Sequence, residues 1–169
     1  MGGRVLFIPE MKDIKNKSVG GLFITDFWNY GMFRSIAESL KKEPSPGTMG
    51  LLLNPANPFF QNFPTEFHSD WQWWIIAKNS RPFILDGAPQ AYLPIVQVID
   101  NFERDYKLGI LFEFAVGKGK LLVSTTNIDA ILEKPEGRQY YQAILKYTAS
   151  DKFNPSTTMS MNDLLRMLK

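Results

Sequence analysis

The stretch LGILFEFAVGKGKLLVST, residues 108–125, decides the fold. Two apolar runs, residues 108–116 and 120–125, lie on either side of the turn Gly117-Lys118-Gly119. Such runs around a short turn that contains glycine are typical of a β-hairpin. The sequence Gly117-Lys118-Gly119-Lys120 lacks the full spacing and the strand-to-helix context of a phosphate-binding loop. We therefore predict an antiparallel hairpin and no phosphate site here.

Short apolar runs alternate with helical patterns on both sides of this hairpin, which indicates a single α/β domain over residues 1–169. Ser69 and Gln72 match a capping box, and Pro135 suits the first turn of a helix. The expected strands are residues 5–8, 19–25, 49–53, 84–85 and 95–99, and the expected helices are residues 30–40, 69–79, 135–148 and 160–168. We predict a mixed sheet, parallel at its centre and antiparallel at the hairpin, with helices on both faces.

The composition excludes several kinds of chemistry. The chain has no cysteine, which removes thiol nucleophiles, cysteine zinc sites and iron–sulfur clusters, and His68 is its single histidine. We therefore predict no metal site and no cofactor. The formal charge is +2 and the basic residues are scattered, which argues against binding of nucleic acid. No apolar run approaches the roughly 18 residues that a membrane span requires.

Polar residues follow several of the expected strands. Ligands of α/β folds bind beyond the carboxyl ends of parallel strands. Those ends offer Asp26, Asn54, Asp86, Asp100 and Thr125. A glycosidase needs two carboxyl groups roughly 5–9.5 Å apart, for which Asp100 and Glu103 are one candidate pair and Glu113 is a further carboxylate. The alternative is that residues 100–105 form a solvated loop with local ion pairs.

Aromatic residues concentrate between residues 59 and 74. Phe67, Trp71 and Trp74 share one helical face by their spacing, whereas Trp73 points away from it. Sugars stack on flat aromatic rings while nearby polar groups bind their hydroxyls. A candidate carbohydrate patch consists of His68, Asp70 and Trp73. The alternative is packing of a helix on the sheet together with contact to a neighbouring domain.

Two longer stretches of the sequence are distinctive, namely TDFWNYGMF at residues 25–33 and FPTEFHSDWQWW at residues 63–74. With residues 45–48, 81–86, 94–101 and 108–122, they resemble the C-terminal region of large bacterial family-2 glycoside hydrolases, the β-galactosidase-like enzymes. The resemblance covers nearly the whole chain. Further candidates for carbohydrate or interdomain contact are Trp28, Asn29 and Tyr30.

The resemblance implies a domain outside the catalytic barrel, with a flavodoxin-like three-layer fold akin to glutamine-amidotransferase-like domains. Amidotransferases use a cysteine, and this chain has none, so that activity does not carry over. No catalytic residue of the hydrolase carries over either. The sequence is also expected to start inside, or at the edge of, the original domain. An uncovered sheet edge or helix-binding face near residues 5–8 would then be exposed and able to pair with another copy.

The leading hypothesis is a non-catalytic accessory domain of a β-galactosidase-like glycoside hydrolase that degrades polysaccharides or oligosaccharides. Its partner would be the remainder of a periplasmic or secreted parent enzyme. The runner-up is a carbohydrate-binding module that uses residues 67–74. An independent hydrolase and a homo-oligomerisation domain stay open as alternatives.

Overall fold

The computed structural model describes residues 2–20, 30–42, 48–101 and 104–168. Its strands are β1 (Arg4–Phe7), β2 (Gly50–Leu53), β3 (Phe83–Ile84), β4 (Val96–Ile99), β5 (Leu108–Val116), β6 (Gly119–Ser124) and β7 (Thr158–Met159). Its α-helices are α1 (Tyr30–Ser39), α2 (Trp74–Lys78), α3 (Pro135–Ala149) and α4 (Met161–Leu168). The 3₁₀-helices are η1 (Lys15–Lys17), η3 (Pro58–Gln61) and η4 (Trp71–Trp73). Of the expected strand 19–25, residues 21–25 lie outside the described residues.

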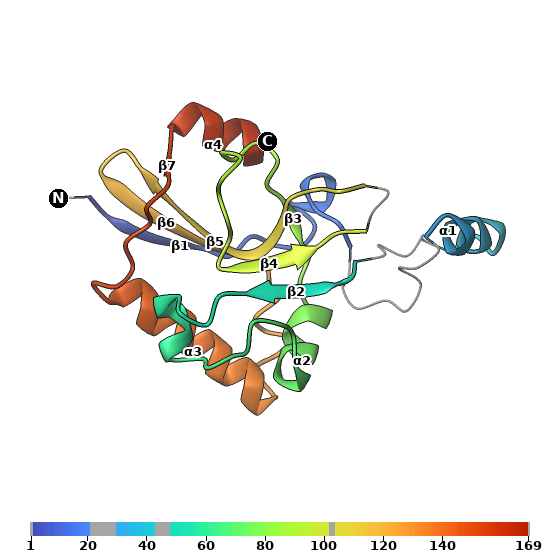
Figure 1. Ribbon diagram of the computed structural model, residues 1–169, viewed down its shortest axis with the longest axis horizontal. Coiled ribbons are helices and arrows are strands. Elements are labelled where there is room, and N and C mark those ends of the chain that lie inside the picture. Colours follow the sequence, from blue (N-terminus) through green and yellow to red (C-terminus); the bar gives the residue numbers. More distant parts are fainter. Residues whose placement is uncertain (1, 21–29, 43–47, 102–103, 169) are drawn as a thin grey trace.

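The sheet is mixed and largely antiparallel (Figure 1). Its strand order is β1-β6-β5-β4-β2, and β3 and β7 also pair with β5. The pairs β2–β4, β3–β5, β4–β5 and β5–β6 are antiparallel, whereas β1–β6 and β5–β7 are parallel. The predicted hairpin is confirmed as β5 and β6.

The prediction of a flavodoxin-like three-layer sandwich with a mostly parallel sheet is wrong, and the lengths of the connections explain why. β4 connects to β5 through residues 100–107, and β5 connects to β6 through Gly117 and Lys118. Neighbouring parallel strands require a crossover of a dozen or more residues, usually a helix. Because these connections are shorter than that, the strands they join pair antiparallel.

Two hydrophobic clusters lie on opposite faces of β5 and β6. One cluster contains Tyr140 and Tyr147 of α3, and the other contains Phe112 of β5 with Leu164 and Met167 of α4. In Figure 1, α2 and α3 lie together on one side of the sheet and α4 lies on the other. The two faces are therefore covered unequally, and the larger apolar core is on the α3 side.

A β-bulge in β5 changes which face its side chains point to. β4 pairs with Gly109 and then with Leu111, so Ile110 is the extra residue of the bulge. Ile110 and Leu111 consequently both belong to the cluster on the α3 side, although they are consecutive. Beyond the bulge, Phe112 and Phe114 belong to the cluster on the α4 side.

One edge of β5 carries a gap between two partner strands. β4 pairs with β5 as far as Leu111, and β7 pairs with β5 from Ala115 onward. The main-chain groups of Glu113 lie between them and face a tyrosine hydroxyl instead of a strand. Tyr92 Oη donates to the Glu113 carbonyl and accepts from the Glu113 amide, each at 2.9 Å. The Tyr92 hydroxyl thus replaces the missing strand at this residue.

β1 forms one end of the strand order, so the predicted sheet edge near residues 5–8 is confirmed. The side chains of Val5 and Phe7 are exposed there. Arg4 fixes this strand to the end of α3, because its guanidinium donates to the Ala149 carbonyl and to Asp151. Within the described ranges, the helices fall short of the length and apolar character needed to cross a membrane.

We expect Tyr92→Phe to lower the free energy of unfolding by about 2 kcal/mol, because both main-chain groups of Glu113 would then lose a buried partner. Urea unfolding followed by circular dichroism measures this change. Tyr106→Phe is the matched control, since the Tyr106 ring is exposed and its hydroxyl makes no hydrogen bond within the described structure. Equal effects of the two substitutions would contradict the role given to Tyr92.

Candidate functional site

The tryptophans of residues 71–74 divide into a buried one and an exposed pair. Trp73 is 0% exposed, and its indole Nε1 donates to Thr65 Oγ1 at 2.8 Å. Its ring makes edge contacts with Phe63 and Tyr140. The interpretation of Trp73 as a surface for sugars is therefore wrong, because this side chain belongs to the core.

Trp71 and Trp74 form the exposed pair. Trp71 is 83% exposed and Trp74 is 43% exposed. Their rings are nearly parallel, with 6° between the planes and 6.3 Å between the centroids. A 3₁₀-helix superimposes residues three apart, and η4 ends where Trp74 begins α2. The local helix type thus aligns the two rings and turns Trp73 toward the core.

The start of this helix also differs from the predicted capping box. Asp70, and not Ser69, is the residue before η4, and its Oδ1 accepts from the Gln72 amide at 3.1 Å. The Gln72 side chain instead donates to the Pro64 carbonyl at 2.8 Å. Asp70 therefore fixes the start of the helix that carries the tryptophan pair.

Polar groups lie around the tryptophan pair. One hollow of about 170 Å³ is lined by Ser69, Asp70 and the two tryptophans. A second, of about 310 Å³, is lined by the same rings with Lys134 and Glu136. This surface can therefore offer flat apolar rings together with hydrogen-bonding groups of both charges. We call Trp71, Trp74, Asp70, Lys134 and Glu136 the tryptophan surface.

Of the remaining aromatic and polar candidates, His68 does not line either hollow. His68 is exposed and packs edge-on against Phe67, at 4.8 Å between ring centroids. The Phe67 carbonyl accepts from the Leu53 amide at 2.9 Å, so this segment borders β2. Trp28, Asn29 and Asp26 lie outside the described residues, and Tyr30 is the first residue of α1.

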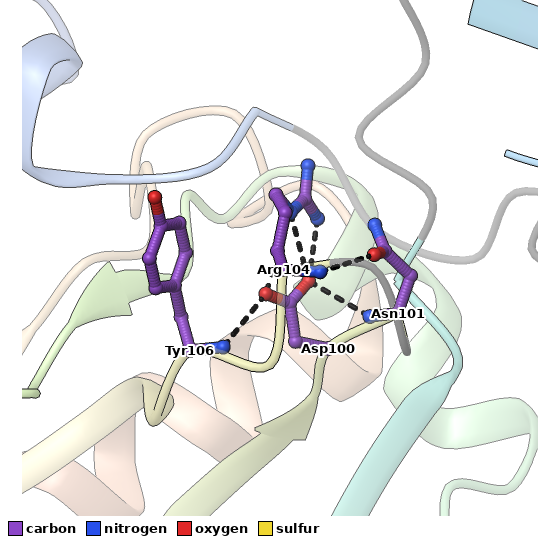
Figure 2. A network of polar contacts seen from close by, with 4 residues as sticks. All are labelled: Asp100, Asn101, Arg104 and Tyr106. Carbon is purple, nitrogen blue, oxygen red and sulfur yellow. Dashed lines mark hydrogen bonds and ion pairs between the residues drawn. The ribbon is translucent and has the colours of Figure 1, made fainter. Parts of the chain in front are cut away.

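Asp100 holds its own loop together (Figure 2). Its carboxylate accepts from Arg104 Nε at 3.2 Å, from the Tyr106 amide at 3.1 Å and from the Asn101 amide at 2.9 Å. The Asp100 side chain is 2% exposed and that of Arg104 is 19% exposed. The alternative of a loop with local ion pairs is thus confirmed for the described part, but Asp100 is buried and Arg104 is half-buried, so the pair is not fully solvated. Glu103 lies outside the described residues.

The other strand-end candidate, Asp86, also has a structural role. Its Oδ1 accepts from the Lys107 amide at 2.8 Å, which joins the end of β3 to the start of β5. Asp86 and Asp100 each bind the main chain of the segment that leads into β5. Across the described ranges, no group of three or more His, Cys, Asp or Glu side chains is placed to hold a metal ion.

Glu113 lines a cleft. It lies in β5 at the gap between β4 and β7, where a cleft of about 250 Å³ has Asn57, Tyr92, Ser156 and Thr157 among its lining residues. Burial raises the pKa of Glu113, while the hydrogen bond from Tyr147 and the charge of Lys120 oppose that rise. Among the described residues that line the cleft, Glu113 is the only carboxylate. These residues therefore do not supply the two carboxylates of a glycosidase.

We expect Asp100→Asn to lower the free energy of unfolding by about 3 kcal/mol, because an amide N–H would face the donors of Arg104 and Tyr106 inside a buried pair. Thermal or urea unfolding measures the change. Glu38→Gln is the control, since Glu38 pairs with Arg34 on the exposed face of α1 and should cost less than about 0.5 kcal/mol. A cost for Asp100→Asn as small as that of the control would contradict the structural role.

No curated protein matches this sequence. A protein-family model described as "Domain of unknown function (DUF8487)" matches residues 1–169, which is the whole chain. The chain therefore belongs to the DUF8487 family.

Proposed function

We propose that this chain is a non-catalytic accessory domain of a glycoside hydrolase and that it binds saccharides through the tryptophan surface. The observation that carries the proposal is the exposure of Trp71, at 83%, beside a nearly parallel Trp74. The resemblance of residues 25–33 and 63–74 to β-galactosidase-like enzymes supports a saccharide as the ligand. In this proposal Trp71 and Trp74 take the stacking role that the sequence pattern assigned to Trp73.

The energetics of an exposed indole favour a ligand with a flat apolar face. Burying apolar surface releases roughly 25 cal/mol per Å², and a tryptophan offers a large rigid area with few rotatable bonds. A pyranose ring covers such an area with its C–H groups and leaves its hydroxyls at the rim. Asp70, Lys134 and Glu136 line the hollows at that rim and can exchange hydrogen bonds with the hydroxyls.

A second candidate is docking against the remainder of the parent enzyme or another copy of the chain. It is favoured by Leu52 and Phe67, which are both exposed on neighbouring segments at the outer edge of β2. These side chains add exposed apolar area that stacking on the tryptophans does not use. Light scattering of the purified chain tests self-assembly. A mass that stays monomeric up to a chain concentration of about 100 μM would rule out self-assembly.

We expect β-linked galacto-oligosaccharides to bind with a millimolar dissociation constant and to shift the NMR signals of the Trp71 and Trp74 indoles. Trp71→Ala should weaken this binding about tenfold or more, since the most exposed stacking ring is lost. Met161→Ala is the matched control, because Met161 is an exposed apolar residue on α4. It should leave binding unchanged.

Two results would contradict the saccharide proposal. One is the absence of any signal change at tens of millimolar oligosaccharide. The other is equal binding by the wild-type chain and by Trp71→Ala. If either result is accompanied by self-association that Leu52→Ser abolishes, docking replaces saccharide binding as the proposed function.

A further inference from the structure

We propose that the cleft at the gap in β5 binds a small molecule through a primary ammonium group, which pairs with Glu113. This site is separate from the tryptophan surface, because the two share no lining residue. We call it the Glu113 cleft and define its polar lining as Asn57, Tyr92, Glu113, Ser156 and Thr157.

The gap in the sheet is what creates this cleft. A continuous partner strand would cover β5 from Leu111 to Ala115, and instead β4 ends and β7 begins on either side of Glu113. The Tyr92 hydroxyl satisfies the main chain of Glu113, so the backbone there needs no further partner. One hydroxyl occupies far less space than a strand, so the space beside Glu113 is open to a ligand.

The Glu113 side chain leaves one oxygen available to a ligand. Its Oε2 accepts from Tyr147 Oη at 2.9 Å. Its Oε1 accepts no hydrogen bond from the residues that the structure describes. A carboxylate has about four acceptor positions on its two oxygens, so most of them are unused. A partly buried carboxylate with unused positions beside an open cleft favours a ligand that donates hydrogen bonds.

A primary ammonium fits this cleft better than a metal ion does. Ca²⁺ takes six to eight oxygen ligands, and several of these are normally carboxylates. Glu113 is the only carboxylate that the described part of the chain contributes to the lining. An ammonium carries one positive charge and three donors, which Glu113 and the hydroxyls of Ser156 and Thr157 can accept. The volume of about 250 Å³ limits the ligand to a small molecule.

Charged and titratable groups from three elements face Glu113. Tyr147 reaches it from α3, Lys120 lies near it on β6, and Tyr92 reaches its main chain from the segment before β4. Burial raises the pKa of Tyr92 and of Tyr147, so both phenols stay neutral at physiological pH. The Lys120 ammonium donates to the Phe153 carbonyl at 2.8 Å. Lys120 therefore stabilises the Glu113 carboxylate without a direct hydrogen bond to it.

The protonation of Glu113 sets how binding depends on pH. Only the carboxylate form pairs with an ammonium, and burial raises the Glu113 pKa above its ordinary value of about 4.3. Binding should therefore be full at neutral pH and weaken as the pH falls through this raised pKa. Bound ammonium should in turn lower the Glu113 pKa, because it stabilises the charged form.

Ethanolamine and ethylene glycol test the proposal as a matched pair, since the second replaces the ammonium with a hydroxyl. We expect ethanolamine to shift the NMR amide signals of Glu113 and its neighbours with a dissociation constant of about 1–10 mM, because so few atoms carry little binding energy. Ethylene glycol should bind at least about tenfold more weakly. Glu113→Gln should abolish the preference, and Trp71→Ala should leave it unchanged.

Three results would overturn the proposal. They are the absence of shifts around Glu113 at 100 mM ethanolamine, equal binding of ethylene glycol, and persistence of the preference in Glu113→Gln. If Glu113→Gln fails to fold, the wild-type chain still tests the proposal, because ethanolamine binding that does not weaken on acidification also overturns it. Loss of saccharide binding in Trp71→Ala bears only on the tryptophan surface, so the two proposals fail independently.

Discussion

The pairing of β5 is the constraint on which the rest of the structure depends. This strand pairs with β3, β4, β6 and β7, and it separates the two hydrophobic clusters. Its bulge at Ile110 directs the earlier part of the strand to one cluster and Phe112 to the other. Where no strand covers it, at Glu113, a tyrosine hydroxyl does so. Both the fold and the Glu113 cleft follow from how the edges of this one strand are satisfied.

The polar residues divide according to whether their groups are already satisfied. Asp100 has its carboxylate bound by Arg104 and by two main-chain amides, and Asp86 is bound by the Lys107 amide. Both aspartates hold loops, and Asp100, with three partner residues, has little capacity left for a ligand. Glu113 has one internal hydrogen bond to its side chain and faces a cleft. Unused hydrogen-bonding capacity beside a cleft, and not position at a strand end, distinguishes the candidate binding residue.

Local signals in the sequence predict local structure well and long-range arrangement poorly. The β5–β6 hairpin and the start of α3 at Pro135 are predictable because each depends on a few adjacent residues. The predicted parallel pairing of the central strands is wrong, because the direction of pairing depends on which distant segments of the chain lie side by side. The exposure of Trp71 is missed because the spacing shows which residues share a helical face but not which face packs against the sheet. Glu113 does leave a signal, as the one charged residue inside the apolar run 108–116.

Hydrogen exchange at the Glu113 amide tests most directly whether a side chain completes the edge of β5. If the Tyr92 hydroxyl accepts this hydrogen bond, the Glu113 amide should exchange about as slowly as the Ala115 amide, which donates to the Thr157 carbonyl at 2.9 Å. NMR-detected exchange into deuterated buffer compares the two amides in one sample. Exchange of Glu113 at the rate of an unprotected amide, with Ala115 still protected, would contradict the account.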